Sequence, residues 1–179
     1  MDFLSHLFLP LVAVYVLRGD LFERHGPWAV GLGGFGVLPD VDKFLGVPGL
    51  FHSVLTVGAV GLALVAIEHR IREVSLSPVV AGLLLSHLAL DFVDGGPVLL
   101  LFPLIETGFG LQYPAQAAFG TGPVGVWIDG PLVTLRAGTP RPGFNTYGFI
   151  QGAGVASALL FGLIYAVDRS RASHEIHEN

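Results

Sequence analysis

LSPVVAGLLLSHLALDFV, residues 76–93, is the stretch that decides the fold. It is almost entirely apolar, and it reaches the length of about 17–25 residues that a helix needs to cross a bilayer. Near its end, His87 and Asp91 are four positions apart. Because an α-helix has about 3.6 residues per turn, these two side chains share one face. The stretch therefore predicts a membrane helix that carries an imidazole and a carboxylate at its C-terminal end.

Four further apolar segments occupy residues 3–17, 27–38, 50–67 and 148–167. Two of them, 50–67 and 148–167, are long enough to span a bilayer. The segment 3–17 is short and 27–38 is about half a bilayer long, so we expect these two to be tilted or partly re-entrant. Glycines recur in the segments, and small residues let helices approach closely in lipid. The sequence thus predicts an all-α fold, a polytopic membrane helical bundle of about five segments.

Composition supports a multi-pass protein of the cell membrane. Hydrophobic residues make up 52% of the chain and charged residues 13%, whereas soluble domains average about 25% charged residues. The chain has no cysteine, which excludes disulfides and thiolate metal sites. Its net charge of −5 comes without a basic cluster, so no nucleic-acid partner is expected.

The 179 residues are enough for one domain. We expect residues 1–179 to form a single membrane domain. Glycine and proline punctuate residues 95–147, which predicts a long outward loop. Residues 168–179 are polar and predict a solvated tail.

The basic residues indicate an orientation. If the five segments cross the membrane alternately, Lys43, Arg136 and Arg141 fall on one face, and the opposite face holds Arg18, Arg24, Arg70, Arg72, Arg169 and Arg171. Positive residues in short loops favour the cytoplasm, so the N-terminus and the long loop should face outward. The same threading brings six polar residues to the outer face: His6, Asp40, Asp42, His52, His87 and Asp91. Ionisable residues within membrane spans are rare and usually functional.

These residues predict a metal site. The pair His87 and Asp91 can hold one ion, or it can be a hydrogen-bonded pair that fixes helix packing. Pro39 ends its segment and exposes Asp40 and Asp42, which form either a cation site or a polar terminus with Asp42 paired to Lys43. Three imidazoles and two or three carboxylates without thiols suit Zn, or else Mn or Fe. The surplus of carboxylates over one tetrahedral shell suggests two ions that share a bridging carboxylate, so we expect one or two divalent ions.

Four motifs in a fixed order carry a resemblance to a known family. They are Ser5-His6, Leu38-Pro39-Asp40-Val41-Asp42, His52-Ser53, and the Gly-x-x-x-Ser-His-x-x-x-Asp pattern of residues 82–91 followed by Gly95-Gly96 and an apolar run ending at Pro103. Over residues 3–105 the chain resembles the YdjM-type membrane-bound metal-dependent hydrolases, which look distantly like the zinc phospholipase C and single-strand nuclease superfamily. The resemblance implies a metal shell of Asp40, His52, His87 and Asp91, with His6 and Asp91 helping to hold a second ion. It also implies attack of metal-activated water on a phosphodiester or related ester.

Two positions depart from the family pattern. Lys43 stands where the family commonly has histidine, and residues 47–52 lack the first histidine of that family's motif. A site without these two imidazoles is expected to bind fewer ions or a different ion. We place Asp42 outside the metal shell, in a catalytic role in which it accepts a proton or orients water.

The sequence leaves three functions open. The favoured one is a membrane hydrolase that is embedded in membrane lipid and acts on a small-molecule or lipid substrate. A non-catalytic membrane scaffold with a structural metal site is the alternative. A small transporter is disfavoured, because the third and fifth segments contain almost no polar residues along the depth of the membrane.

Overall fold

The computed structural model describes residues 2–47, 49–71, 76–113, 115–118, 121–122, 124–128, 131, 133–138 and 149–177. Most of these residues are helical. In chain order the elements are α1 (Phe3–Leu17), α2 (Gly19–His25), the 3-10 helices η1 (Gly26–Gly36) and η2 (Leu38–Asp40), α3 (Val41–Leu45), α4 (Val54–Ile71), α5 (Ser77–Val93), β1 (Gly108–Gln112), β2 (Ala115–Ala118), β3 (Gly125–Ile128), β4 (Thr134–Gly138) and α6 (Gly152–His177).

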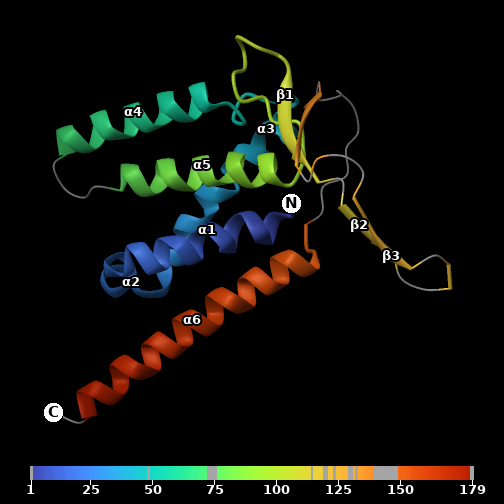
Figure 1. The fold of residues 1–179 in the computed structure, drawn as a ribbon. Helices are drawn as coiled ribbons and strands as arrows, with labels where there is room; N and C mark the ends of the chain where they lie inside the picture. The colour runs from blue at the N-terminus through green and yellow to red at the C-terminus, as the bar shows by residue number, and fades with distance from the viewer. Residues whose placement is uncertain are drawn as a thin grey trace.

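Four helices form the body of the molecule (Figure 1). Helix α1 packs against α5 and α6, and α4 packs against α5. Helices α1, α4 and α6 begin at the end of the bundle that carries the strands, and α5 ends there. Two clusters of buried apolar side chains fill the interior, one around Leu11 and Leu83 and the other around Leu84 and Leu88.

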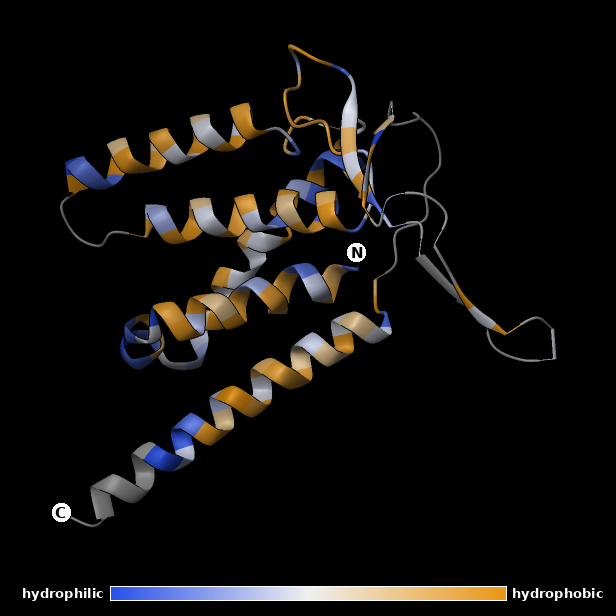
Figure 2. Ribbon diagram, viewed as in Figure 1, coloured by the Kyte–Doolittle hydropathy of each residue, from blue (hydrophilic) through white to orange (hydrophobic). Residues whose placement is uncertain are grey.

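The prediction of five membrane segments is not confirmed. Helices α4 and α6 are long and apolar enough to cross a membrane, and α1 with the following helical stretch to Gly36 would make a third span that is bent by 95°. Helix α5 is apolar but has only 17 residues. Figure 2 shows apolar residues along the helices and polar ones gathered at their ends.

The segment 27–38 forms most of η1 rather than an α-helix, and η1 lies against α1. A Cβ on Gly36 would lie 2.4 Å from the carbonyl oxygen of His6, and a Cβ on Gly33 would lie 3.1 Å from that of Leu7. Only glycine permits such a close approach of two backbones. The glycines therefore bring η1 and the turn after it to the same end of the bundle as His6.

The all-α prediction is wrong within residues 95–147. Strand β1 pairs with β4 and β2 pairs with β3, both antiparallel. A β-bridge between Val98 and Phe109 attaches β1 to the segment that follows α5. Each strand has four or five residues, which is too short for an alternating pattern to stand out from a glycine-rich loop.

Polar caps set the boundaries of two helices. Asp2 caps α1, because its Oδ1 accepts from the backbone N–H of Ser5 at 2.7 Å. At the other end of the bundle, Glu68 of α4 accepts from the hydroxyl of Ser77 at 2.6 Å and from the backbone N–H of that residue at 2.7 Å. Helix α6 continues to His177, so most of the predicted polar tail, residues 168–179, belongs to a helix.

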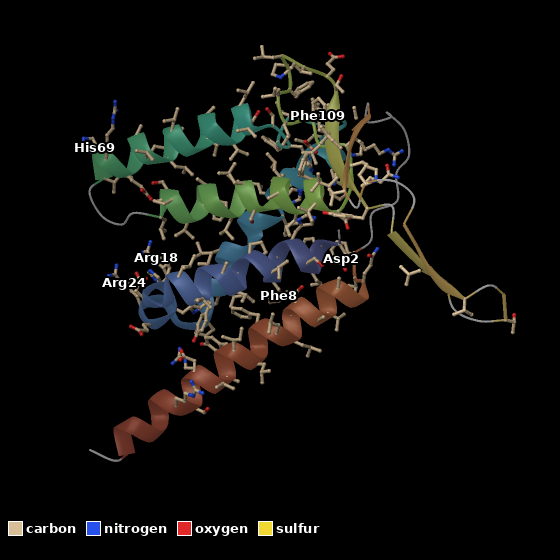
Figure 3. The ribbon with its side chains drawn as sticks, in the orientation of Figure 1. Asp2, Phe8, Arg18, Arg24, His69 and Phe109 are labelled. Carbon is tan, nitrogen blue, oxygen red and sulfur yellow. The ribbon has the colours of Figure 1, made fainter. Side chains whose placement is uncertain are left out.

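The two ends of the bundle differ in charge, as the sequence predicts. Figure 3 places Arg18, Arg24 and His69 at one end, and Asp2 and Phe109 at the other. The C-terminal part of α6, with Arg169 and Arg171, lies at the same end as Arg18 and Arg24. Arg72 and Arg141 lie outside the described residues.

Candidate metal centre

Four side-chain atoms converge where α5 ends. The Nε2 atoms of His52 and His87 are 3.2 Å apart. Each of them lies 3.5 Å from Oδ1 of Asp40 and 3.5 Å from Oδ2 of Asp91. All four atoms lie within 4.8 Å of one another. The structure thus brings together the four residues that the family resemblance implies for one metal shell.

The spacing of these atoms fits one small divalent ion. Zinc binds nitrogen and oxygen ligands at about 2.0–2.2 Å, so the corners of a tetrahedral shell lie about 3.3–3.6 Å apart. Four separations of 3.5 Å fall within that range and the fifth, 3.2 Å, lies just below it, while the two carboxylate oxygens lie within 4.8 Å of each other. Two nitrogen and two oxygen donors also suit Zn, Mn and Fe chemically.

The ligands come from three separate parts of the chain. Asp40 ends η2, directly after Pro39, which cannot continue a regular helix at that point. His52 lies in the turn that precedes α4, and His87 and Asp91 lie on one face of the last turns of α5. An ion bound here would therefore join three elements that are distant in sequence.

The far ring nitrogens of both histidines are already engaged. The Nδ1 of His87 is 2.7 Å from the carbonyl oxygen of Gly36, which can only accept a hydrogen bond. The Nδ1 of His52 donates to Oδ2 of Asp42 at 2.9 Å. With a proton on each Nδ1, a neutral ring presents the lone pair of its Nε2. This fixing of the tautomer is typical of metal-binding histidines.

The two Nε2 atoms thus face two carboxylate oxygens, and this arrangement needs a cation between them, either a proton or a metal ion. Burial is the largest single influence on His52 and acts to lower its pKa. Hydrogen bonds to Asp40, Asp42 and Asp91 outweigh it and raise the pKa of His52 to about 10. Burial likewise acts to raise the pKa of Asp40, but contacts with His52 and His87 hold it well below the usual range. A metal ion would replace the proton on His52.

His6 lies beside this cluster and contacts it through Asp91. Its Nε2 is 3.0 Å from Oδ1 of Asp91, the oxygen that faces away from the other histidines. Its ring stacks on that of His87, with ring centroids 4.0 Å apart. Its Nδ1 is buried and has no hydrogen-bond partner among the described residues. These contacts orient Asp91, and the assignment of His6 as a metal ligand stays a prediction.

Asp42 and Lys43 take places that the sequence did not indicate. The side chain of Asp42 is fully buried, and its Oδ2 also accepts from the backbone N–H groups of Gly49 and Phe51, both at 3.0 Å. Those contacts suit a residue that positions His52, and the predicted catalytic role of Asp42 stays untested. Lys43 donates a hydrogen bond from Nζ to Asp40 rather than to Asp42, so the alternative of an Asp42–Lys43 pair is wrong.

Sequence reasoning missed the backbone groups that support the site. The carbonyl of Gly36 orients His87, and the hydroxyl of Ser53 binds the carbonyl oxygens of Leu100 and Phe102 at 3.3 and 2.7 Å. The two hydrogen bonds donated by Ser53 tie the start of α4 to the segment after α5. The glycine cluster before Leu38 was the available signal for the first contact. No local pattern indicated the second.

The centre has one partly open side. The side chains of Asp40, His52 and His87 are at most 8% exposed, whereas Asp91 is 16% and Lys43 is 44% exposed. The exposed side of the cluster therefore lies beside Asp91 and Lys43.

Comparisons of the chain with protein-family models, with curated proteins and with solved structures found no match. The resemblance to the YdjM-type hydrolases therefore rests on the four motifs alone. The geometry of the centre and its position at one end of an apolar helical bundle are the observations that bear on function.

Proposed function

We propose that the protein is an integral membrane hydrolase that uses a divalent metal ion to cleave a phosphoester or a related ester. The observation that carries the proposal is the convergence of four potential ligand atoms, two imidazole nitrogens and two carboxylate oxygens, within 4.8 Å of one another. Both histidines have their Nδ1 atoms engaged, which leaves their Nε2 atoms directed at the two carboxylates. Two imidazoles and two carboxylates meeting in this way form a ligand set that suits a small divalent ion.

The proposed roles follow from the contacts. His52, His87, Asp40 and Asp91 would hold the ion, which is most simply zinc, with manganese or iron as alternatives. Such an ion lowers the pKa of bound water and polarises an ester oxygen. Asp42 holds His52 in place and His6 holds Asp91 in place. Lys43 lies on the open side, where its ammonium group would attract an anionic substrate.

A non-catalytic scaffold with a structural metal site is the second candidate, and one observation favours it. Four protein side chains fill a tetrahedral shell, as in structural zinc sites, whereas catalytic zinc sites usually have three protein ligands and one open position. The partial exposure of Asp91 and Lys43 supports the enzyme instead.

Metal removal separates these two candidates. The protein would be purified in detergent, and bound metal per chain would be measured before and after chelation. Thermal unfolding and the hydrolysis of phosphodiesters and phospholipids would be followed on the same samples. An enzyme is expected to lose nearly all hydrolysis on chelation and to regain it when zinc or manganese is restored. A loaded protein that cleaves none of the substrates, yet unfolds at a lower temperature after chelation, would support the scaffold.

We further propose that the metal centre faces outward, away from the arginine-rich end of the bundle. Because α4 connects the turn after Asp40 to Arg70, one crossing should separate them. Reporter fusions are expected to place Lys43 and the loop of residues 95–147 outside, and Arg70 and Arg72 inside. Detection of Arg70 and the Asp40 turn on one side of the membrane would contradict this topology.

A further inference from the structure

Lys43 places a fixed positive charge on one of the carboxylates of the metal centre. Its Nζ donates to Oδ1 of Asp40, the same oxygen that faces the Nε2 atoms of His52 and His87. Lys43 reaches this oxygen from α3, one helical turn beyond Asp40. The ammonium group therefore lies at the edge of the shell, on the carboxylate that Asp40 would share with a second ion.

Asp91 is engaged on both of its oxygens. Its Oδ2 faces the two Nε2 atoms, while its Oδ1 contacts Nε2 of His6 at 3.0 Å. A second ion bridged by Asp91 would have to displace His6 from that oxygen or bind through the other ring nitrogen. Both oxygens of Asp91 therefore lie beside imidazole nitrogens, and Oδ1 of Asp40 lies beside two imidazole nitrogens and the ammonium group of Lys43.

Formal charges also balance with one ion. Asp40, Asp42 and Asp91 contribute three negative charges, Lys43 contributes one positive charge, and histidine ligands bind metals in their neutral form. Over these four described groups, one divalent ion brings the sum of charges to zero. A second would add two positive charges beside Asp40, Asp42, His52 and His87, which are buried, and uncompensated buried charge is costly.

We infer that the centre binds one divalent ion per chain and that the ammonium group of Lys43 takes the place of a second. This inference rests on the proposed metal-dependent function and specifies its charge arrangement. In such a centre, Lys43 supplies the positive charge that a second ion would otherwise offer to an anionic ester.

The test is metal stoichiometry in the full chain, purified in detergent and saturated with Mn²⁺ or Zn²⁺, without reference to activity. We expect one ion per chain in the unchanged protein and in Lys43→Arg, which keeps the charge. Lys43→His offers an imidazole ligand and removes the fixed charge, and we expect its stoichiometry to approach two. Electron paramagnetic resonance of the Mn²⁺ form should show an isolated ion in the first two proteins and an exchange-coupled pair in Lys43→His.

Two ions per chain in the unchanged protein would overturn the inference. One ion per chain in a folded Lys43→His variant would overturn it as well. Neither result would contradict the presence of a metal centre. If Lys43→His does not fold, the count in the unchanged protein still decides. No bound ion in the unchanged protein would instead refute the proposed function itself, and the inference with it.

Discussion

Asp91→Asn is expected to remove bound metal and hydrolysis almost completely, with a loss of affinity greater than about 100-fold, whereas Asp42→Asn retains part of both. Asp91 faces both Nε2 atoms at 3.5 Å, and a neutral amide is a much weaker metal ligand. Asp42 acts through Nδ1 of His52, and changes to residues that orient a ligand typically cost about 10- to 100-fold in affinity or activity.

The measurement is bound metal per chain for the two variants under identical purification, together with hydrolysis of any substrate found. Both substitutions preserve side-chain size, and a circular dichroism spectrum would verify that each variant keeps its helices. If both variants retained full metal, neither carboxylate would belong to the centre. His87 and Asp91 would then be a pair that fixes helix packing.

Gly36→Ala is expected to destabilise the protein by about 1–3 kcal/mol, the usual cost of adding a methyl group to a tightly packed site. The new Cβ would lie 2.4 Å from the carbonyl oxygen of His6, so η1 would have to move away from α1. The carbonyl of Gly36 would then no longer hold Nδ1 of His87 at 2.7 Å. Bound metal should therefore fall in the same variant.

Gly34→Ala is the matched control, because it lies in the same 3-10 helix and a Cβ there would meet nothing within 4 Å. Thermal unfolding and metal content should match those of the unchanged protein in Gly34→Ala and be lower in Gly36→Ala. Equal values in the two variants would show that the approach of η1 to α1 does not support the centre.

Much of the helical framework could be predicted from the sequence. The apolar segments 3–17 and 76–93 correspond to α1 and α5 with at most one residue of difference, because uninterrupted hydrophobicity is a local property of the chain. The order of apolar segments also predicts that His6, His52 and His87 reach one end of the bundle, and the structure confirms it.

What the sequence could not reveal depends on contacts between distant residues. The pairing of β1 with β4 joins Gly108 to Gly138, and no local pattern predicts which short strands meet. The partner of Lys43 depends on the turn of α3, which brings it back to Asp40 rather than to its neighbour Asp42. The contact between Gly36 and His87 likewise spans 51 positions of the chain, so only the folded backbone shows it.

The cap of α1 has a consequence for how the protein is made. Asp2 accepts from Ser5 within α1 and also, through Oδ2, from the backbone N–H of Gly154 at 3.3 Å, 152 residues later. The four ligands of the metal centre leave the ribosome well before Gly154 does. During synthesis the centre can therefore assemble while α1 still lacks its contact with α6. That contact can form only after Gly154 has been synthesised, and the separation of 152 residues between its two partners adds to the entropic cost of forming it.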